Sequence, residues 1–270
     1  MRCAGVFFLF FPVLFAQPDP RELVRQSIQN GERAWRDSFS YACVERDVTR
    51  RLGESGRVKV SSDDVYQVIP LGYHTSFSEL VSHDGEPIPK EQLAKERKEL
   101  ARLEAESPAE KERRFEKERE ERAYMLEVPD AFDFTIAGVE NLPTGPAWVV
   151  DAVPHAGYQA RSRYGRMFRA MKGRLWIDQK DVQWVKADAV AMEDVSFGFF
   201  VARLAKGSHI VLEQQKLPDG SWVPKDIQAR ANARLFVFFN HNFEENISYS
   251  DYRKPAAAVA ATHSADRTAH

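Results

Sequence analysis

Residues 173–186 read Gly-Arg-Leu-Trp-Ile-Asp-Gln-Lys-Asp-Val-Gln-Trp-Val-Lys, and they have the pattern of a β-hairpin. Arg174–Asp178 and Val182–Ala187 are rich in β-branched and aromatic residues, and Asp178-Gln-Lys-Asp181 between them is rich in turn formers. Two strands joined by so short a connection pair antiparallel. This hairpin therefore predicts an antiparallel sheet, which the flanking sequence extends in both directions.

Further strands with the same character are predicted on both sides of this hairpin, separated by Gly- and Asp-containing turns. They are Tyr41–Val48, Arg57–Val60, Val65–Ile69, Thr75–Val81, Phe134–Val139, Ala147–Val153, Val195–Leu204, His209–Lys216, Trp222–Ala231 and Leu235–Tyr252, the last being either two strands or one long bent strand. Most connections are too short for a helical crossover, which disfavours a parallel α/β fold. The predicted fold class is therefore α+β, with one large curved antiparallel sheet.

Two helical regions accompany the strands. Residues 20–36 are predicted to form an amphipathic helix, capped by Asp19, with an apolar face made of Val24, Ile28, Gly31 and Trp35. Residues 90–122 contain 11 Lys or Arg and 11 Glu, and a capping box at Ser107-Pro-Ala-Glu110 divides them into two helices. Such a segment is either a solvated helix pair or a mobile flap over the space below it.

The first residues have the features of an export signal. Arg2 precedes the apolar run Ala4–Ala16, which is shorter than the about 20 residues that cross a bilayer. Cleavage before Gln17 is predicted, and an N-terminal membrane anchor is the alternative. The expected organisation is a signal peptide at 1–16, a single domain at 17–254 with an inserted helical segment at 90–126, and a disordered tail at 255–270.

Composition and motifs argue against several classes of function. With 38 basic and 40 acidic residues, the net charge of −2 is untypical of a nucleic-acid-binding protein. The seven histidines lack the spacing of a metal site, and no nucleophile or phosphate-loop motif is present. Cys43 has apolar strand neighbours typical of a buried, inert thiol rather than a catalyst, and the adjacent carboxylates Asp63-Asp64 and Glu244-Glu245 point to opposite sheet faces. We therefore expect no cofactor, no metal and no enzymatic activity.

Aromatic side chains are the main candidates for a binding site. Phe197–Val201 and Leu235–Phe239 are apolar on both faces, so they are either core strands or the wall of a ligand cleft. Aromatic type and strand parity select the following candidate cavity residues: Trp35, Phe39, Phe77, Trp148, Trp176, Phe197, Phe199, Phe236 and Phe238.

Residues 161–174 form a second candidate surface, because they contain six basic residues and no acidic one. The basic residues are Arg161, Arg163, Arg166, Arg169, Lys172 and Arg174. Met167, Phe168 and Met171 give this segment a short apolar edge. It is either a connecting helix with a solvated face or a patch for anionic lipid headgroups or an acidic partner.

The hairpin around Trp176 and Asp178, the turn Asp219-Gly220-Ser-Trp222 and the order of elements resemble the bacterial outer-membrane lipoprotein-sorting superfamily. That superfamily includes the periplasmic lipoprotein chaperone, its outer-membrane receptor and a related sigma-factor regulator. The resemblance implies an unclosed β-barrel whose concave side is plugged by helices and holds acyl chains. The charged segment 90–122 and the length of the chain depart from the pattern of the carriers.

The function expected from these features is non-covalent binding of a lipid or an acylated protein in an apolar cleft of a monomeric periplasmic protein. The second hypothesis is a periplasmic sensor or scaffold that binds another envelope protein and carries no lipid. A third, a hydrolase with unpaired carboxylates, has no acid–base arrangement in the sequence to support it. An anionic membrane surface remains a further possible partner through the basic segment, and nucleic acid is not expected.

Overall fold

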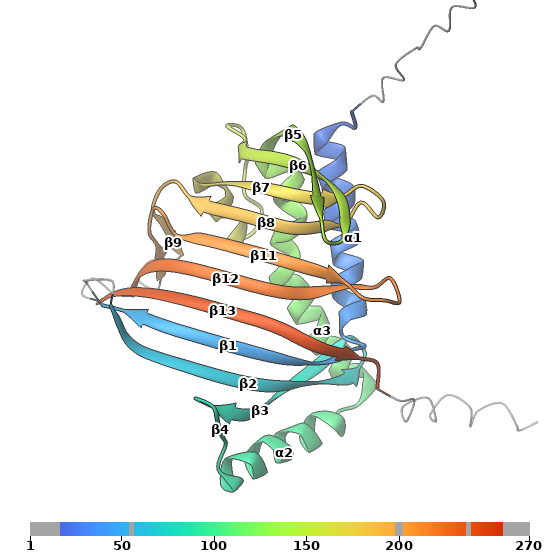
Figure 1. Ribbon diagram of the computed structural model, residues 1–270, viewed down its shortest axis with the longest axis vertical. Helices are drawn as coiled ribbons and strands as arrows, with labels where there is room; N and C mark the ends of the chain where they lie inside the picture. Colours follow the sequence, from blue (N-terminus) through green and yellow to red (C-terminus); the bar gives the residue numbers. More distant parts are fainter. Residues whose placement is uncertain (1–16, 54–56, 198–201, 236–238, 256–270) are drawn as a thin grey trace, which may run out of the picture.

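The computed structural model describes residues 17–53, 57–197, 202–235 and 239–255, and it shows a large antiparallel sheet with helices on one face (Figure 1). The strand order is β4-β3-β2-β1-β13-β12-β11-β8-β7-β6-β5, and the short hairpin of β9 and β10 joins through β10 to β12. Within the described residues, the end strands β4 and β5 do not pair with each other, so the sheet is an unclosed half-barrel. This confirms the predicted α+β fold class.

Strands occur at or beside most of the predicted positions, and several of them extend further along the chain than predicted. They are β1 (Ala42–Leu52), β2 (Val58–Gly72), β3 (Thr75–His83), β4 (Glu86–Pro87), β5 (Phe132–Leu142), β6 (Gly145–Pro154), β7 (Met171–Asp178), β8 (Trp184–Ala191), β9 (Val195–Phe197), β10 (Ala202–Leu204), β11 (His209–Lys216), β12 (Trp222–Leu235) and β13 (Phe239–Arg253).

Two strand predictions are wrong. The single strand β2 (Val58–Gly72) takes the place of the two predicted strands Arg57–Val60 and Val65–Ile69. The polar residues between them remain paired with β1, for example Asp63 with Val48. The predicted strand Val195–Leu204 is a hairpin instead, in which Val195 of β9 pairs with Leu204 of β10. Both errors have one cause: backbone pairing, which the side-chain pattern of one segment does not reveal, sets where a strand continues.

Helix α1 (Pro20–Ser38) covers part of the inner face of the sheet, packing across β5, β8 and β12. Asp19 caps it by accepting a hydrogen bond from the Glu22 backbone N–H at 2.7 Å, as predicted. Next to α1 lie the short helices η1 (Ala123–Glu127) and α4 (Val128–Ala131), and η2 (Tyr164–Ala170) packs against these two. No helix of the described residues is both long and apolar enough to cross a membrane.

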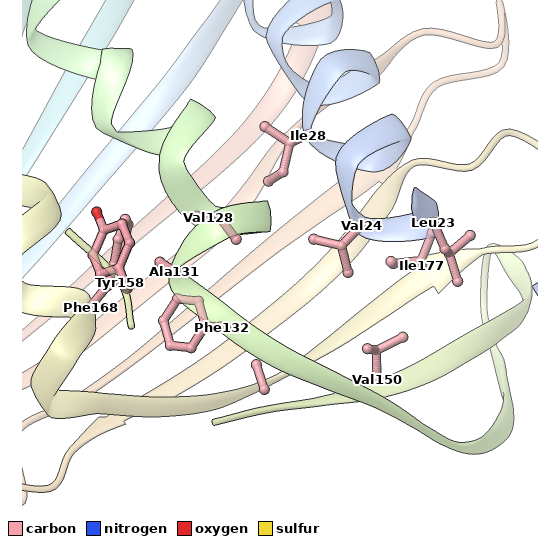
Figure 2. Packing of buried hydrophobic residues seen from close by; sticks show 11 residues of the cluster. Leu23, Val24, Ile28, Val128, Ala131, Phe132, Val150, Tyr158, Phe168 and Ile177 are labelled. Atoms are coloured by element: carbon pink, nitrogen blue, oxygen red, sulfur yellow. The ribbon is translucent and has the colours of Figure 1, made fainter. Parts of the chain in front are cut away.

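The hydrophobic core lies between these helices and the β5–β7 end of the sheet (Figure 2). Val24 and Ile28 of α1 contribute to it together with Val128 of α4, Val150 of β6 and Ile177 of β7. Val24, Val150 and Ile177 are fully buried. Burial of these aliphatic side chains holds α1 and α4 on the sheet, because each side chain stabilises the folded state in proportion to the apolar area that it removes from water.

The charged segment forms helices α2 (Lys90–Glu104) and α3 (Pro108–Arg122), which separate at the predicted capping box of Ser107 and Glu110. Helix α2 lies along β3, and α3 crosses behind the strands on the same side as α1 (Figure 1). Phe115 of α3 is buried and stacks on Trp35 of α1, with ring centroids 5.4 Å apart. Helix α3 is therefore anchored to α1.

Candidate functional site

An apolar cavity of about 160 Å³ lies on the inner face of the sheet, beside the hydrophobic core. Its floor is formed by strands β5 to β8 and β11, and its other walls by α1, η1, α4 and η2. Side chains of the lining include Ile28, Tyr124, Met125, Val128, Phe132, Phe134, Ala152, Met167, Phe168, Met171, Leu175, Trp184, Ala187, Ala189, Ile210 and Leu212. The surface that faces the cavity is almost wholly apolar.

The hollow exists because small residues meet in register on three neighbouring strands. Ala152 of β6 pairs with Gly173 of β7, and Gly173 pairs with Ala189 of β8. Directly paired residues share a sheet face, so these three form one row with little side-chain volume. The row continues into larger residues on both sides, Phe134 of β5 and Ile210 of β11. The floor is thus a depression bounded by an aromatic and an aliphatic side chain.

The register also defines the ends of the cavity along the strands. Trp184 pairs with Ile177 near the β7–β8 turn and is 8% exposed, so its indole closes that end together with Ile28 of α1. Met167 and Phe168 of η2 close the opposite end, beyond Met171. The cavity is therefore short and bounded by bulky side chains at both ends.

A buried carboxylate joins two of the cavity walls. Glu127, at the end of η1, is 3% exposed and accepts hydrogen bonds from Tyr158 Oη (2.5 Å), Arg161 N (2.8 Å) and Ser162 N (2.9 Å). Burial alone raises the pKa of this carboxyl, but the hydrogen bonds outweigh that effect and hold its pKa below the ordinary value. Glu127 therefore stays ionised and fully hydrogen-bonded between η1 and the segment that leads to η2.

The inner face changes polarity across the sheet. The small-residue row continues from Ile210 through Ala229 of β12 to Glu245 of β13 and Thr49 of β1. The neighbouring row runs from Leu212 through Ile227 and Ile247 to Asp47. Burial is the largest influence on the carboxyl groups of Glu45, Asp47 and Glu245, and it raises the pKa of each. The apolar cavity thus lies in one half of the inner face, and carboxyl groups lie in the other.

None of the five predicted aromatic cavity residues whose side chains are described lines this cavity. Trp35 and Phe39 pack with Phe115 between α1 and α3, and Trp148 packs against the core from β6. Phe77 lies in β3, opposite Ile69 of β2.

Trp176 lies on the outer face, where its indole N–H donates to Glu140 at 2.7 Å and the ring borders a polar hollow of about 440 Å³. Phe197 lies in β9, but its side chain is outside the described part, as are residues Phe199, Phe236 and Phe238.

The predicted basic segment divides between two places. Lys172 and Arg174 alternate in β7 with the cavity-facing Met171, Gly173 and Leu175, so their side chains extend from the outer face. There the Arg174 guanidinium donates to Asp151 at 2.6 Å.

The other four arginines lie on or next to η2. Arg161 pairs with Asp130 at 3.1 Å, the Arg169 guanidinium donates to the Tyr158 carbonyl at 3.0 Å, and the Arg163 guanidinium lies over the Tyr164 ring at 5.8 Å. Arg166 is exposed within η2. These four remain candidates for a surface that meets anionic groups.

The described residues hold no cluster of His, Cys, Asp or Glu suited to a metal ion. Cys43 is a buried free thiol, and burial raises its pKa to about 11. Asp63 and Asp64 face different partners, Arg46 (2.8 Å) and His83 (2.5 Å), and do not act on a common point. The described side chains around the cavity thus give it an almost wholly apolar surface.

No family model matches this sequence, and no curated protein sequence matches it either. Among solved structures, a DUF1329 family protein from Desulfovibrio piger aligns with 89% of this chain and 95% of its own at 12% identity, with a TM-score of 0.32. A LolA superfamily protein from Nitrosomonas europaea aligns over the same shares at 9% identity, with a TM-score of 0.32.

A putative outer membrane lipoprotein-sorting protein domain from Vibrio parahaemolyticus covers 87% of this chain and 94% of its own at 10% identity, with a TM-score of 0.29. The names of these three proteins describe those proteins and assign no ligand to this chain.

Proposed function

We propose that this protein is an exported, carrier-like protein of the periplasm that holds part of an acyl chain non-covalently in the inner-face cavity. The cavity of about 160 Å³ and its apolar lining carry this proposal. A cavity of about 150 Å³ with such a lining stays dry and accepts a molecule the size of benzene. A saturated segment of about six carbon atoms is of that size.

The expected binding energy follows from the size of the cavity. Each methylene group removed from water contributes about 0.8 kcal/mol, so about six groups contribute roughly 5 kcal/mol before the entropic cost of binding. The remainder of a longer chain would lie along the inner face towards β11 and β12, where Leu212 and Ile227 continue the apolar row. No covalent step is part of this function.

Titration with dansyl-undecanoic acid, followed by fluorescence, tests the proposal. Ala189→Phe places a phenyl ring on the cavity floor and is expected to weaken binding at least about tenfold, which corresponds to about 1.4 kcal/mol. Ala137→Phe is the matched control, because Ala137 is exposed on β5 and outside the cavity lining. Equal affinity of the parent and Ala189→Phe would contradict binding in this cavity.

Native mass spectrometry of protein isolated from a bacterial periplasm distinguishes this function from that of a sensor or scaffold. Co-purified lipid supports the carrier, whereas a bound protein without lipid supports the sensor. N-terminal sequencing of the same material tests the export signal: the chain is expected to begin near Gln17, and an intact Met1 in a membrane fraction contradicts cleavage.

A further inference from the structure

The polar hollow on the outer face of the sheet has a volume of about 440 Å³ and is half open to solvent. Small-molecule sites typically have volumes of about 300–1,000 Å³, so this hollow is large enough to be one. A regular antiparallel sheet presents an even array of side chains on its solvated face, and a hollow there requires a local irregularity.

The first irregularity is a β-bulge in β8. Lys186 of β8 pairs with Trp176 of β7. Trp184 pairs with the next residue of β7, Ile177, so Val185 is an extra residue between the two pairs. An extra residue of this kind bends its strand and redirects the neighbouring side chains, and Val185 lines the hollow.

A second bulge lies at the same level of the sheet, in β12. Asp226 pairs with Glu213 of β11, and Pro224 pairs with the residue that follows Glu213, so Lys225 is extra. Glu213 also pairs with Lys186, and the pairing of β8 with β11 ends there. Beyond that pair, β11 has no partner strand on its β8 side within the described residues. Its backbone N–H and C=O groups on that side are therefore left for solvent or for a ligand.

The charged side chains of the hollow are already paired. The Glu213 carboxylate lies 2.9 Å from the Lys225 ammonium and 3.0 Å from the Lys186 ammonium. Lys216 pairs with Asp181 at 2.5 Å. A ligand with a strong net charge of either sign would have to displace a partner from one of these ion pairs, so the lining favours a neutral ligand.

The remaining groups of the lining are an aromatic ring, amides and a hydroxyl. Trp176 borders the hollow, and its N–H donates to Glu140 at 2.7 Å, which holds the indole in place. Gln214 and Gln215 contribute amide groups. Thr144 also lines the hollow, and its hydroxyl oxygen is buried without a hydrogen-bond partner among the described residues. Such orphaned polar atoms are uncommon in folded proteins, and a ligand in the hollow is a source of the missing partner.

From this geometry we propose that the outer-face hollow is a binding site for a neutral sugar, such as a mono- or disaccharide. A pyranose ring has a face of C–H groups that packs on an indole, and its hydroxyl groups bond to amides, carboxylates and hydroxyls. The lining provides all of these groups. The inference goes beyond the proposed function and does not depend on it, because the hollow lies on the face of the sheet opposite the apolar cavity.

Saturation-transfer-difference NMR with maltose and with N,N′-diacetylchitobiose tests the site and distinguishes a hexose from an N-acetylated amino sugar. Saturation is expected to reach mainly the C–H groups of one ring face. Trp176→Ala is expected to weaken binding by at least about tenfold, because it removes the aromatic surface. Thr144→Val keeps the shape and removes one hydrogen bond, which should weaken binding by about threefold to tenfold.

Tyr73→Ala and Thr135→Val are the matched controls, because Tyr73 and Thr135 are exposed and lie outside the lining. Both should leave the affinity unchanged. Circular dichroism checks that the variants are folded, and Trp176→Phe replaces an unfolded Trp176→Ala, with a smaller loss of affinity expected because an aromatic face remains. Absence of saturation transfer to both sugars would overturn the proposal, as would transfer that is unchanged in both Trp176→Ala and Thr144→Val. Tighter binding of citrate or spermidine than of either sugar at this hollow would overturn the neutral class of ligand.

Discussion

Gly31 of α1 lies directly against the indole ring of Trp184 in β8, so that a Cβ atom at Gly31 would be 2.4 Å from Trp184 Nε1. This relationship explains a glycine in the middle of a 19-residue helix, where it is otherwise unfavourable. It also holds the indole at the end of the cavity, because α1 leaves the ring no space to move away from the strand.

Gly31→Ala is therefore expected to destabilise the protein, although alanine favours a helix over glycine by about 1 kcal/mol. Overpacking against Trp184 should lower the free energy of unfolding by about 1–3 kcal/mol, measured by urea denaturation. The exposed Gln29→Ala on the same helix serves as the control and should change it by less than about 0.5 kcal/mol. A stabilised Gly31→Ala protein would show that α1 shifts freely on β8.

The two charged helices are expected to differ in hydrogen exchange. Lys111 of α3 is buried and its ammonium donates to the carbonyls of Leu71 (3.2 Å) and Glu104 (3.1 Å), and Arg122 pairs with Glu32 of α1 at 2.9 Å. In α2, by contrast, Leu103 is the one buried residue of that helix. The amides of α2 should exchange faster than those of α3, and both faster than those of β13 and β1. Equal protection of α2 and β1 would contradict this order.

Replacement of residues 90–122 by a short Gly/Ser linker tests whether they are an insertion. The β-domain is expected to remain folded, because the core between α1, α4 and β5–β7 contains no residue of the replaced segment. The same change removes Phe115 and uncovers Trp35, which should shift the tryptophan fluorescence. An unfolded product would show that the segment is part of the folding unit, and altered uptake of dansyl-undecanoic acid would identify it as a lid.

Cys43 should react slowly with thiol reagents under native conditions. The side chain is buried, and the desolvation that raises its pKa to about 11 leaves little thiolate at neutral pH. The rate of reaction with Ellman's reagent is expected to rise by several orders of magnitude in urea, where the thiol regains a pKa near 8.5. Rapid labelling of the native protein would contradict the packing of β1.

His83 provides a pH-dependent prediction. A hydrogen bond from the ring to Asp64, with the negative charges of Asp84 and Asp64 nearby, raises the pKa of His83 above its usual 6.5. Its contribution to stability is therefore complete below pH 6.5 and is lost as the pH rises through the higher native pKa. NMR titration should show this raised pKa, and Asp64→Asn should bring it back towards 6.5; an unchanged pKa in that variant would exclude Asp64 as its main cause.

The sequence predicts much of the sheet because alternation and turn residues are local signals. His209–Lys216 is predicted with both ends correct, and α1 is predicted within two residues at its C-terminal end. The cavity, however, depends on Ala152, Gly173 and Ala189, which are separated in sequence and become neighbours only through strand register. No local pattern in the sequence reveals which small residues will face each other.

Two site residues were missed for related reasons. Glu127 follows a segment with 11 glutamates, so its residue type alone does not mark it as a carboxylate that becomes buried. Trp184 lies in the strand predicted at Val182–Ala187, which the structure shows as Trp184–Ala191, but parity assigned the candidate role to Trp176, which the register places on the outer face. Glu127 occurs next to Val128-Pro129, a break in the charge pattern, and that break is the one signal that could have marked it.

Because the half-barrel does not close, its main run of strands ends at β4 and at β5 within the described residues, and each of these edges carries its own obstacle to joining another sheet. At one edge, β4 has only two residues, and Pro87 provides no N–H for a further strand. At the other, Gly138 adopts a φ of +154° at an irregularity in the β5–β6 pairing, which interrupts the straight row of donors and acceptors. Edge-to-edge polymerisation, the common hazard of open sheets, is thereby opposed at both ends, and the protein can keep an accessible inner face without becoming prone to fibre formation.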